Sequence, residues 1–288
     1  MTTAVHTKMM TETQFRRLGA IIHERSGIHF PASKKYVLES RLSQRLMELG
    51  IEDYDTYITC LAVGPHQWAE FQEMLDRVTI NETSFFRDDR QLAVFERTVL
   101  PELLAARAGS RRLRLWSAAC ASGEEPYTLA ILVHRALGAR LPDWRVEILG
   151  TDISDKALSA GITGVYTDQA VSPMPKTVRD RYFSPEDRHW RIDDTIRSMV
   201  SFDRHNLRDR LGAARYGIWD AIFCRNVLIY FDEDMRRRVV ELFHDRVAND
   251  GYLFIGHSES LRDLGVPFES AHAPEGFCYR KSPMSDSA

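Results

Sequence analysis

The sequence predicts an all-helical N-terminal domain followed by an α/β domain with a Rossmann-like, doubly wound sheet. Apolar residues recur at helical spacing from residue 12 to about residue 80. Beyond about residue 111, short apolar strands alternate with helices, which is typical of a parallel sheet with helices on both faces. Polar side chains follow several of these strands, at the edge where such sheets bind ligands.

The composition is that of an ordinary folded protein without a strong charge. The chain has 288 residues, 44% hydrophobic and 27% charged, which allows one large or two smaller domains. With 38 Lys and Arg against 41 Asp and Glu, the net charge is −3, so neither nucleic-acid binding nor a polybasic membrane anchor is indicated. No apolar run is long enough to span a membrane. Four cysteines without a CxxC pair predict a reduced, cytoplasmic protein without a metal site.

Four amphipathic helices are predicted within the N-terminal domain, residues 1–80. Glycines at 27, 50 and 64 end the first three. The apolar stripes consist of Phe15, Leu18, Ile21 and Ile22; of Leu38, Leu42, Leu46 and Leu49; of Tyr54, Tyr57, Ile58 and Leu61; and of Trp68, Phe71, Leu75 and Val78. The short connections predict a small bundle. Residues 81–110 are expected to form a linker with a junction helix.

The α/β domain is predicted to span residues 111–288. The expected strands are 113–119, 146–150, 200–203, 221–224, 252–256 and 277–280, and the expected helices are 126–137, 154–160 and 232–247. Residues 164–198 interrupt this alternation with three prolines and an alternating run at 189–192. They predict a small antiparallel β-subdomain inserted in the sheet domain.

Two features after the first two strands of this domain suggest a nucleotide-type ligand. Residues 116–127 (WSAACASGEEPY) form a turn of small residues before a helix N-terminus, and Glu124 and Glu125 there suit a cationic ligand. A purely structural turn, with acids favoured by the helix dipole, is an equally good interpretation. Asp152 ends the next strand, where it could accept hydrogen bonds from ribose hydroxyls or cap the following helix. Together with the small-residue turn, the ribose role is favoured.

Two further strands are followed by polar pairs. Asn206-Leu207 could meet the edge and face of an adenine, although taken alone an ordinary loop explains this pair better. Arg225 and Asn226 follow an apolar strand, with Tyr230 shortly after them. Arg225 and Asn226 are hard to explain as core residues, because buried polar groups need partners.

Two motifs lie outside the predicted sheet. Residues 81–87 (NETSFFR) could close over a cleft, although a capped helix start with both phenylalanines in the core explains this segment better on its own. Arg41 and Arg45 share one face of the second helix. That basic face could receive an acidic partner helix, but a solvated face is the more usual outcome.

Taken together, these motifs resemble the chemotaxis receptor methyltransferases, the CheR family. The resemblance covers nearly the whole chain. It rests on NETSFFR at 81–87, WSAACASGEEPY at 116–127, TDIS at 151–154, HNL at 205–207, CRNVLIYF at 224–231 and GHSES at 256–260. Ordered blocks at consistent spacing are far more specific than any one of them.

The resemblance implies a class I methyltransferase that moves a methyl group from S-adenosylmethionine to glutamate side chains on the cytoplasmic helical bundle of receptors. It implies cofactor binding by Asn81, Thr83, Arg87, Glu125, Asp152, Asn206, Leu207, Arg225 and Asn226. Arg87 and Tyr230 would lie near the methyl group and the substrate carboxylate, and Arg41 and Arg45 would dock the receptor. No metal is implied, and we expect a monomer.

The residue types agree with this chemistry. A glutamate carboxylate, with an unperturbed pKa of about 4.3, is already a nucleophile at neutral pH, so no general base is needed. Two departures from the family concern the receptor. Gln44 and Met47 stand where more positive charge is expected, and residues 183–190 lack the glycine of a loop that grips a receptor's C-terminal pentapeptide, which argues against such a tether.

Two alternatives remain open. A methyltransferase acting on nucleic acid or a small molecule could use the same cofactor domain, but the chain has Arg225-Asn226-Val227-Leu228 in place of the Asn/Asp-Pro-Pro-aromatic turn of amino-directed DNA enzymes. A cofactor-binding adaptor without turnover is the non-enzymatic alternative. The presence of Arg87 and Tyr230 argues weakly against it.

Overall fold

The computed structural model describes residues 9–63 and 65–282. These residues form two compact units. The helical unit consists of Met1–Ile80 together with a short later segment, Tyr230–Asp232. The α/β unit consists of Asn81–Ile229 and Glu233–Ala288.

The helical unit contains the four predicted helices, α1 (Glu12–Ser26), α2 (Lys35–Glu48), α3 (Tyr54–Val63) and α4 (Gln67–Val78). Thr11 and Gln14 form a capping box that begins α1, and Gly27 ends it in the left-handed conformation with φ +78°. Most stripe residues are buried. Leu49 and Trp68 are exceptions, 41% and 66% exposed, so their expected places in the apolar stripes were wrong. Trp68 lies under the guanidinium of Arg25.

The α/β unit contains a seven-stranded sheet in the order β6-β2-β1-β7-β8-β10-β9. Its strands are β1 (Arg112–Ala118), β2 (Arg145–Asp152), β6 (Val200–Arg204), β7 (Trp219–Cys224), β8 (Val247–Ile255), β9 (Phe268–Ala273) and β10 (Gly276–Lys281). The five strands from β6 to β8 are parallel, whereas β10 runs antiparallel to both β8 and β9. The predicted doubly wound fold is confirmed, but the sheet is mixed rather than wholly parallel.

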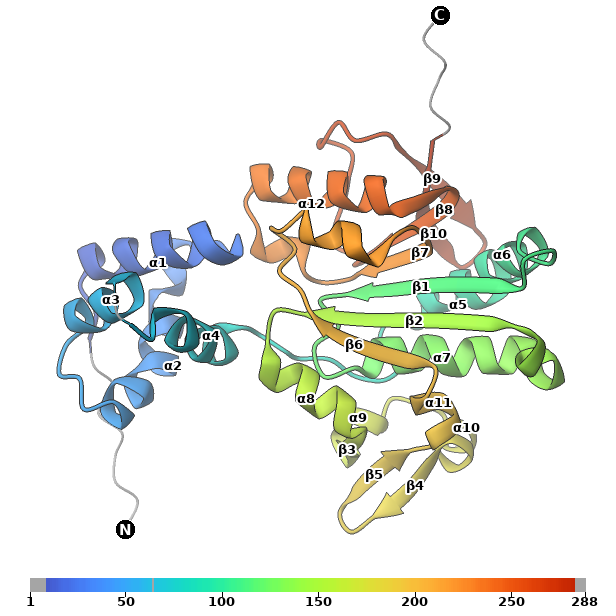
Figure 1. The fold of residues 1–288 in the computed structure, drawn as a ribbon, viewed down its shortest axis with the longest axis horizontal. Helices are drawn as coiled ribbons and strands as arrows, with labels where there is room; N and C mark the ends of the chain where they lie inside the picture. The colour runs from blue at the N-terminus through green and yellow to red at the C-terminus, as the bar shows by residue number, and fades with distance from the viewer. Residues whose placement is uncertain (1–8, 64, 283–288) are drawn as a thin grey trace, which may run out of the picture. The chain divides into compact units, whose positions relative to one another are not determined.

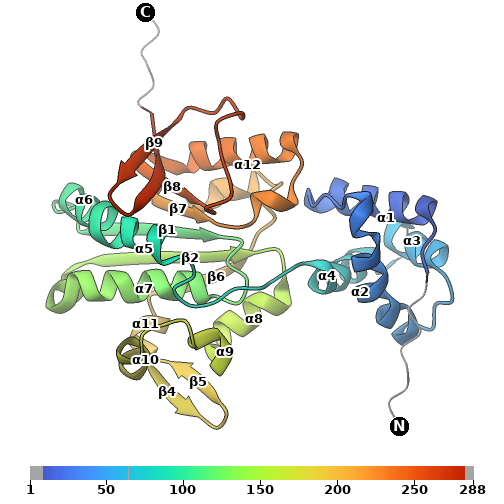
Figure 2. The same ribbon diagram turned by 180° about the vertical axis from the view of Figure 1, so that it is seen from behind.

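Helices cover both faces of this sheet (Figures 1 and 2). Leu115 on β1 belongs to the core cluster shared with α7 (Glu124–Leu137), α5 (Asp89–Val94), the π-helical turn Phe95–Val99 and α6 (Leu100–Ala106). The next residue, Trp116, points to the opposite face because side chains alternate along a strand, and it contacts Phe243 of α12 (Glu233–Arg246). The helix α8 (Asp155–Thr163) follows β2.

A small three-stranded antiparallel sheet lies within the segment in which an insertion was predicted. It has the order β3-β5-β4, from β3 (Val165–Thr167), β4 (Phe183–Glu186) and β5 (His189–Ile192). The short helices α9 (Asp168–Val171), α10 (Lys176–Tyr182) and α11 (Asp194–Arg197) accompany it. In the part of the chain that the structure describes, no helix has the length and apolar character needed to cross a membrane.

Candidate functional site

The candidate site lies at the carboxyl edge of the parallel strands β1, β2, β6 and β7. The register places Ala118 opposite Thr151, and Asp152 opposite Arg204, so the residues after these strands meet at one edge. Several non-glycine residues around this edge have a left-handed backbone, namely Phe86, Asp88, Ala119, Ala121 and Asn226. Such conformations persist only where surrounding contacts hold them, and they concentrate at functional sites.

The turn after β1 lies at this edge of the sheet and has an unusual backbone. Ala119 and Ala121 have φ values of +57° and +48°, and Gly123 precedes α7 with φ +91°. A Cβ atom on Gly123 would lie 2.9 Å from the ring of Phe202, so no larger residue fits. The small residues of this turn are therefore needed for packing. They would also give a ligand access to the backbone.

Asp152 is buried at the end of β2 and joins the two turns of the site. Its Oδ2 accepts a hydrogen bond from the amide of Ala121 at 2.9 Å, and its Oδ1 accepts one from Ser154 at 2.9 Å. Ser154, not Asp152, is the N-cap of α8, since its hydroxyl accepts from Ala157. The helix-cap alternative for Asp152 was therefore wrong. Each carboxylate oxygen can accept more than one hydrogen bond, so this group is suited to ribose hydroxyls.

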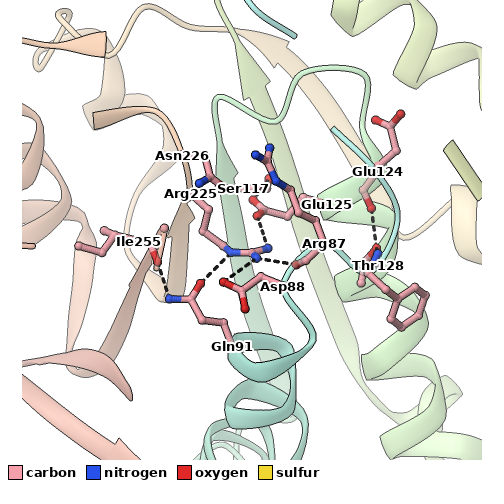
Figure 3. A network of polar contacts seen from close by, with 12 residues as sticks. Arg87, Asp88, Gln91, Ser117, Glu124, Glu125, Thr128, Arg225, Asn226 and Ile255 are labelled. Atoms are coloured by element: carbon pink, nitrogen blue, oxygen red, sulfur yellow. Dashed lines mark hydrogen bonds and ion pairs between the residues drawn. The ribbon is translucent and has the colours of Figure 1, made fainter. Parts of the chain in front are cut away.

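Arg225 is the centre of a buried polar network (Figure 3). Its side chain is only 4% exposed. Its Nε donates to Gln91 at 2.9 Å, one terminal nitrogen donates to Glu125 at 3.1 Å, and the other donates to the carbonyl oxygen of Arg87 at 2.5 Å. The second carboxylate oxygen of Glu125 accepts from Ser117 at 2.7 Å. Arg225 thus fixes both Glu125 and the backbone at Arg87, which explains how its charge is compensated.

The segment 81–88 is irregular rather than helical, with a turn at Phe85-Phe86, and α5 begins only at Asp89. The alternative of a capped helix start was therefore wrong. Phe85 is fully buried and its amide donates to the carbonyl oxygen of Ala170, while Phe86 is half-buried and its amide donates to the Thr128 hydroxyl. The Arg87 side chain is exposed and donates to the carbonyl oxygen of Glu82. Asn81 and Thr83 lie half-buried in the same segment.

The residues after β6 place an amide and an apolar side chain at the same edge. Leu207 is buried, and the Asn206 side chain accepts from the Arg208 amide at 3.0 Å. The preceding His205 is buried between Trp116 and Tyr216, with ring-centre separations of 6.0 and 5.3 Å. Burial lowers the pKa of His205 to about 4, because the protonated ring would lose its hydration.

His205 is expected to make folding sensitive to mild acid. Its pKa is about 6.5 when unfolded and about 4 when folded, so between these values the unfolded chain binds a proton that the folded chain does not. Stability contributed by the neutral ring is present above pH 6.5 and is lost as the pH falls toward 4, by up to about 1.4 kcal/mol per pH unit. The pH dependence of the free energy of unfolding, measured by urea denaturation, should lack this component in His205→Phe. His272→Gln, a substitution at an exposed histidine, should keep the pH dependence of the wild type. If stability changed with pH by the same amount in the wild type, His205→Phe and His272→Gln, the prediction would be contradicted.

Glu259 was not among the predicted site residues, yet it holds the loop that follows β7. Its Oε2 accepts from the amides of Asn226 at 3.1 Å and Gly256 at 2.6 Å, and its Oε1 accepts from Ile229 at 3.2 Å. The carboxylate is buried, and Asn226 has a left-handed φ of +61°. Glu259 belongs to the GHSES motif noted in the sequence, but the sequence does not show that its carboxylate contacts residues 226–229.

Glu259→Gln is expected to lower the free energy of unfolding by about 2 kcal/mol, because an amide NH₂ would replace one of the oxygens that face only N–H donors. Urea denaturation of the full chain measures this. The matched control is Glu233→Gln, which removes the charge of an exposed glutamate paired with Arg237 and should change stability by less than about 0.5 kcal/mol. Equal effects of the two substitutions would rule out the loop-holding role.

Three predicted site residues belong to the helical unit. Tyr230 lies in its later segment. Arg41 donates to the carbonyl oxygens of Val78 at 2.9 Å and Thr79 at 2.8 Å, at the end of α4. Arg45 pairs with Glu70 at 2.5 Å and Glu48 at 3.3 Å, and its hydrogen bond to Glu70 raises its pKa well above the usual range. Among residues 9–63 and 65–282, no three His, Cys, Asp or Glu side chains gather in a way that could hold a metal ion.

The fold and this edge define a class: a Rossmann-like domain for a nucleotide-type cofactor whose first turn differs from the GxGxxG turn of dinucleotide enzymes. Comparison with known proteins identifies it further. Residues 13–79 match the family model described as the CheR methyltransferase all-alpha domain, and residues 81–277 match the CheR methyltransferase SAM binding domain.

Curated relatives agree over almost the whole chain. The chain is 36% identical to chemotaxis protein methyltransferase 2 of Vibrio cholerae serotype O1, covering 90% of each chain. It is 33% identical to the chemotaxis protein methyltransferase of Borreliella burgdorferi, covering 88% of this chain and 90% of the relative. It is 34% identical to chemotaxis protein methyltransferase 1 of Pseudomonas aeruginosa, covering 92% and 97%. The chain therefore belongs to the CheR family of S-adenosylmethionine-dependent methyltransferases, which confirms the resemblance noted in the sequence.

Proposed function

We propose that this enzyme transfers the methyl group of S-adenosylmethionine to glutamate side chains on the cytoplasmic helical bundle of methyl-accepting chemotaxis receptors. The products are glutamyl methyl esters and S-adenosylhomocysteine. The observation that carries the proposal is the match of both domains, residues 13–79 and 81–277, to one family whose relatives are chemotaxis protein methyltransferases. The reaction takes place in the cytoplasm, with the enzyme acting as a monomer and without a metal.

The carboxyl edge of the sheet is the proposed cofactor site. Its proposed ligands are Asn81, Thr83, Arg87, Glu125, Asp152, Asn206, Leu207 and Asn226, with Arg225 behind them. The buried carboxylate of Asp152 suits the ribose hydroxyls, and Asn206-Leu207 offers an amide and an apolar surface for adenine. Because the guanidinium of Arg225 is occupied by Gln91, Glu125 and the Arg87 carbonyl, its proposed role is to hold these ligands in place.

The chemistry requires alignment more than proton transfer. S-adenosylmethionine supplies an electrophilic methyl group, and the substrate carboxylate is already ionised at neutral pH. The protein must orient the carboxylate in line with the methyl group and limit the cost of removing its water. The proposed donors to that carboxylate are the exposed side chain of Arg87 and the hydroxyl of Tyr230.

Recognition of the receptor is proposed to use the α2 surface around Arg41 and Arg45. Both side chains also hold the helical unit together, so a binding test on their variants needs a parallel stability measurement. The turn between β4 and β5 uses Asp187, with φ +53°, instead of glycine. This turn supports methylation without a grip on a C-terminal receptor peptide.

The test is methyl transfer from radiolabelled S-adenosylmethionine to a purified receptor cytoplasmic fragment. We expect label that is released as methanol in alkali, because a carboxyl methyl ester is base-labile, and no label when the accepting glutamates are replaced by alanine. Arg87→Ala separates two roles: lost transfer with retained cofactor affinity places Arg87 at the substrate, and loss of both makes it mainly a cofactor ligand. Alkali-stable label, or none, would overturn the proposed substrate.

A further inference from the structure

The segment Tyr230–Asp232 is held by the helical unit, although its neighbours in the sequence, Ile229 and Glu233, belong to the α/β unit. The loop that contains it begins after β7, where Glu259 fixes the amides of Asn226 and Ile229. The two ends of the loop thus have different anchors. Because Tyr230 is the proposed donor to the substrate carboxylate, the anchor at its end of the loop bears on the reaction.

Three successive residues of this segment are each held by the last turn of α1 or by the two residues that follow Gly27. The amide of His29 donates to the carbonyl oxygen of Tyr230 at 2.8 Å. Ile28 pairs with Phe231 in an antiparallel bridge. The Nε2 atom of His23, in the last turn of α1, lies 2.7 Å from Oδ2 of Asp232.

The geometry of α1 makes these contacts possible together. Gly27 ends the helix in the left-handed conformation, and its amide closes the last turn onto the carbonyl oxygen of His23. The chain then turns out of the helix at Ile28, whose amide donates to the Ser26 hydroxyl at 3.2 Å. His23 on the last turn and Ile28 on the exit therefore reach neighbouring residues of one short segment.

We propose that His23 is a positioning residue for the methyl transfer. With Asp232 it forms the side-chain part of a clasp, and the pairing of residues 28–29 with 230–231 forms the backbone part. The clasp fixes the backbone at Tyr230 and thereby the place of its hydroxyl. This inference rests on the proposed role of Tyr230.

The solvent exposure of the His23–Asp232 pair determines the effect expected when the pair is removed. The side chains of His23 and Asp232 are 43% and 37% exposed, so the pair contributes little to global stability. A contact of this strength can still shift a local equilibrium of the segment by about fivefold. We therefore expect His23→Leu to lower kcat about fivefold and to leave the Kd for S-adenosylmethionine and the melting temperature unchanged.

The kinetic test uses the full-length enzyme with a receptor cytoplasmic fragment. His23→Gln should restore kcat, because its side-chain amide nitrogen can donate to Asp232 in place of Nε2. Combining His23→Leu with Asp232→Ala should cost no more than either change alone. In a Tyr230→Phe background, His23→Leu should have no further effect; a further loss there would overturn positioning through Tyr230. The control is Arg17→Leu, which removes the exposed ion pair between α1 and Asp55 and should leave kcat unchanged.

A second measurement does not depend on activity. Hydrogen exchange of the peptide 226–234 in the full chain should be faster in His23→Leu than in the wild type and unchanged in Arg17→Leu. Unchanged exchange in His23→Leu would overturn the clasp. If the wild-type enzyme failed to methylate any receptor glutamate, the proposed function would fall, and the exchange result alone would then decide whether His23 holds this segment.

Discussion

Replacing Arg225 with methionine is expected to lower the free energy of unfolding by about 3–5 kcal/mol. Arg225 is 4% exposed, and its guanidinium satisfies Gln91, Glu125 and the carbonyl oxygen of Arg87. Removing it leaves the Glu125 carboxylate in a partly buried place without its cation, and it leaves two further acceptors without a donor. Methionine keeps much of the volume, so the loss is one of charge and hydrogen bonds rather than of packing.

The same substitution should weaken S-adenosylmethionine binding by at least about tenfold, a change of about 1.4 kcal/mol. The reason is that Glu125 and the segment at Arg87 both lose the group that holds them in place. Arg225→Lys should bind S-adenosylmethionine with an affinity between those of the wild type and Arg225→Met. An ammonium group keeps the charge but cannot donate in the fixed fork of a guanidinium.

Urea denaturation and calorimetric titration measure the two effects of Arg225→Met. The control is Arg112→Met, which removes an arginine that is 46% exposed and pairs with Glu147. It should change stability by less than about 1 kcal/mol and leave cofactor affinity unchanged. If Arg225→Met changed stability and cofactor affinity as little as Arg112→Met, the network around Arg225 would not determine the structure of the cofactor site.

The local part of the site could be predicted from the sequence because it depends on neighbouring residues. The small-residue turn after β1 and the acid at the end of β2 follow strands that are apolar and regularly spaced, so their shared edge follows from the topology. Helix stops at Gly27 and Gly50 are equally local, since both residues have positive φ. Such features need no knowledge of which distant segments meet.

The rest depends on contacts between distant residues. Glu259 meets Asn226 across 33 residues, and His23 meets Asp232 across 209. The hydrogen bonds of Arg41 to the carbonyl oxygens at the end of α4 could not be predicted, because nothing in α2 shows that these oxygens need a donor. The strand β9 was missed for a different reason: its sequence, FESAHA, has little apolar character, and none of its residues is fully buried. Its place in the sheet follows from its pairing with β10.

Asp152→Ala is expected to raise the Kd for S-adenosylmethionine by at least about 100-fold. A hydrogen bond to a charged group contributes about 1.5–3 kcal/mol, and two ribose hydroxyls are proposed to donate to this carboxylate. The substitution also removes the acceptor for the amides of Ala121 and Ser154, which lie on both sides of the site. Asp152→Asn should be nearly as damaging, because its NH₂ group would face one of these N–H donors.

Comparing two ligands distinguishes the loss of a contact to the ribose from a general distortion of the binding site. Calorimetry with S-adenosylhomocysteine and its 2′-deoxy analogue should show that the wild type discriminates between them and that Asp152→Ala does not. Asp155→Asn is the matched control, because Asp155 begins α8 three residues later, is about half exposed and pairs with Arg204. It should bind both ligands as the wild type does. If Asp152→Ala still preferred the ribose-containing ligand by the wild-type factor, Asp152 would brace the turn after β1 without contacting the cofactor, and the ribose would have to be held by another group.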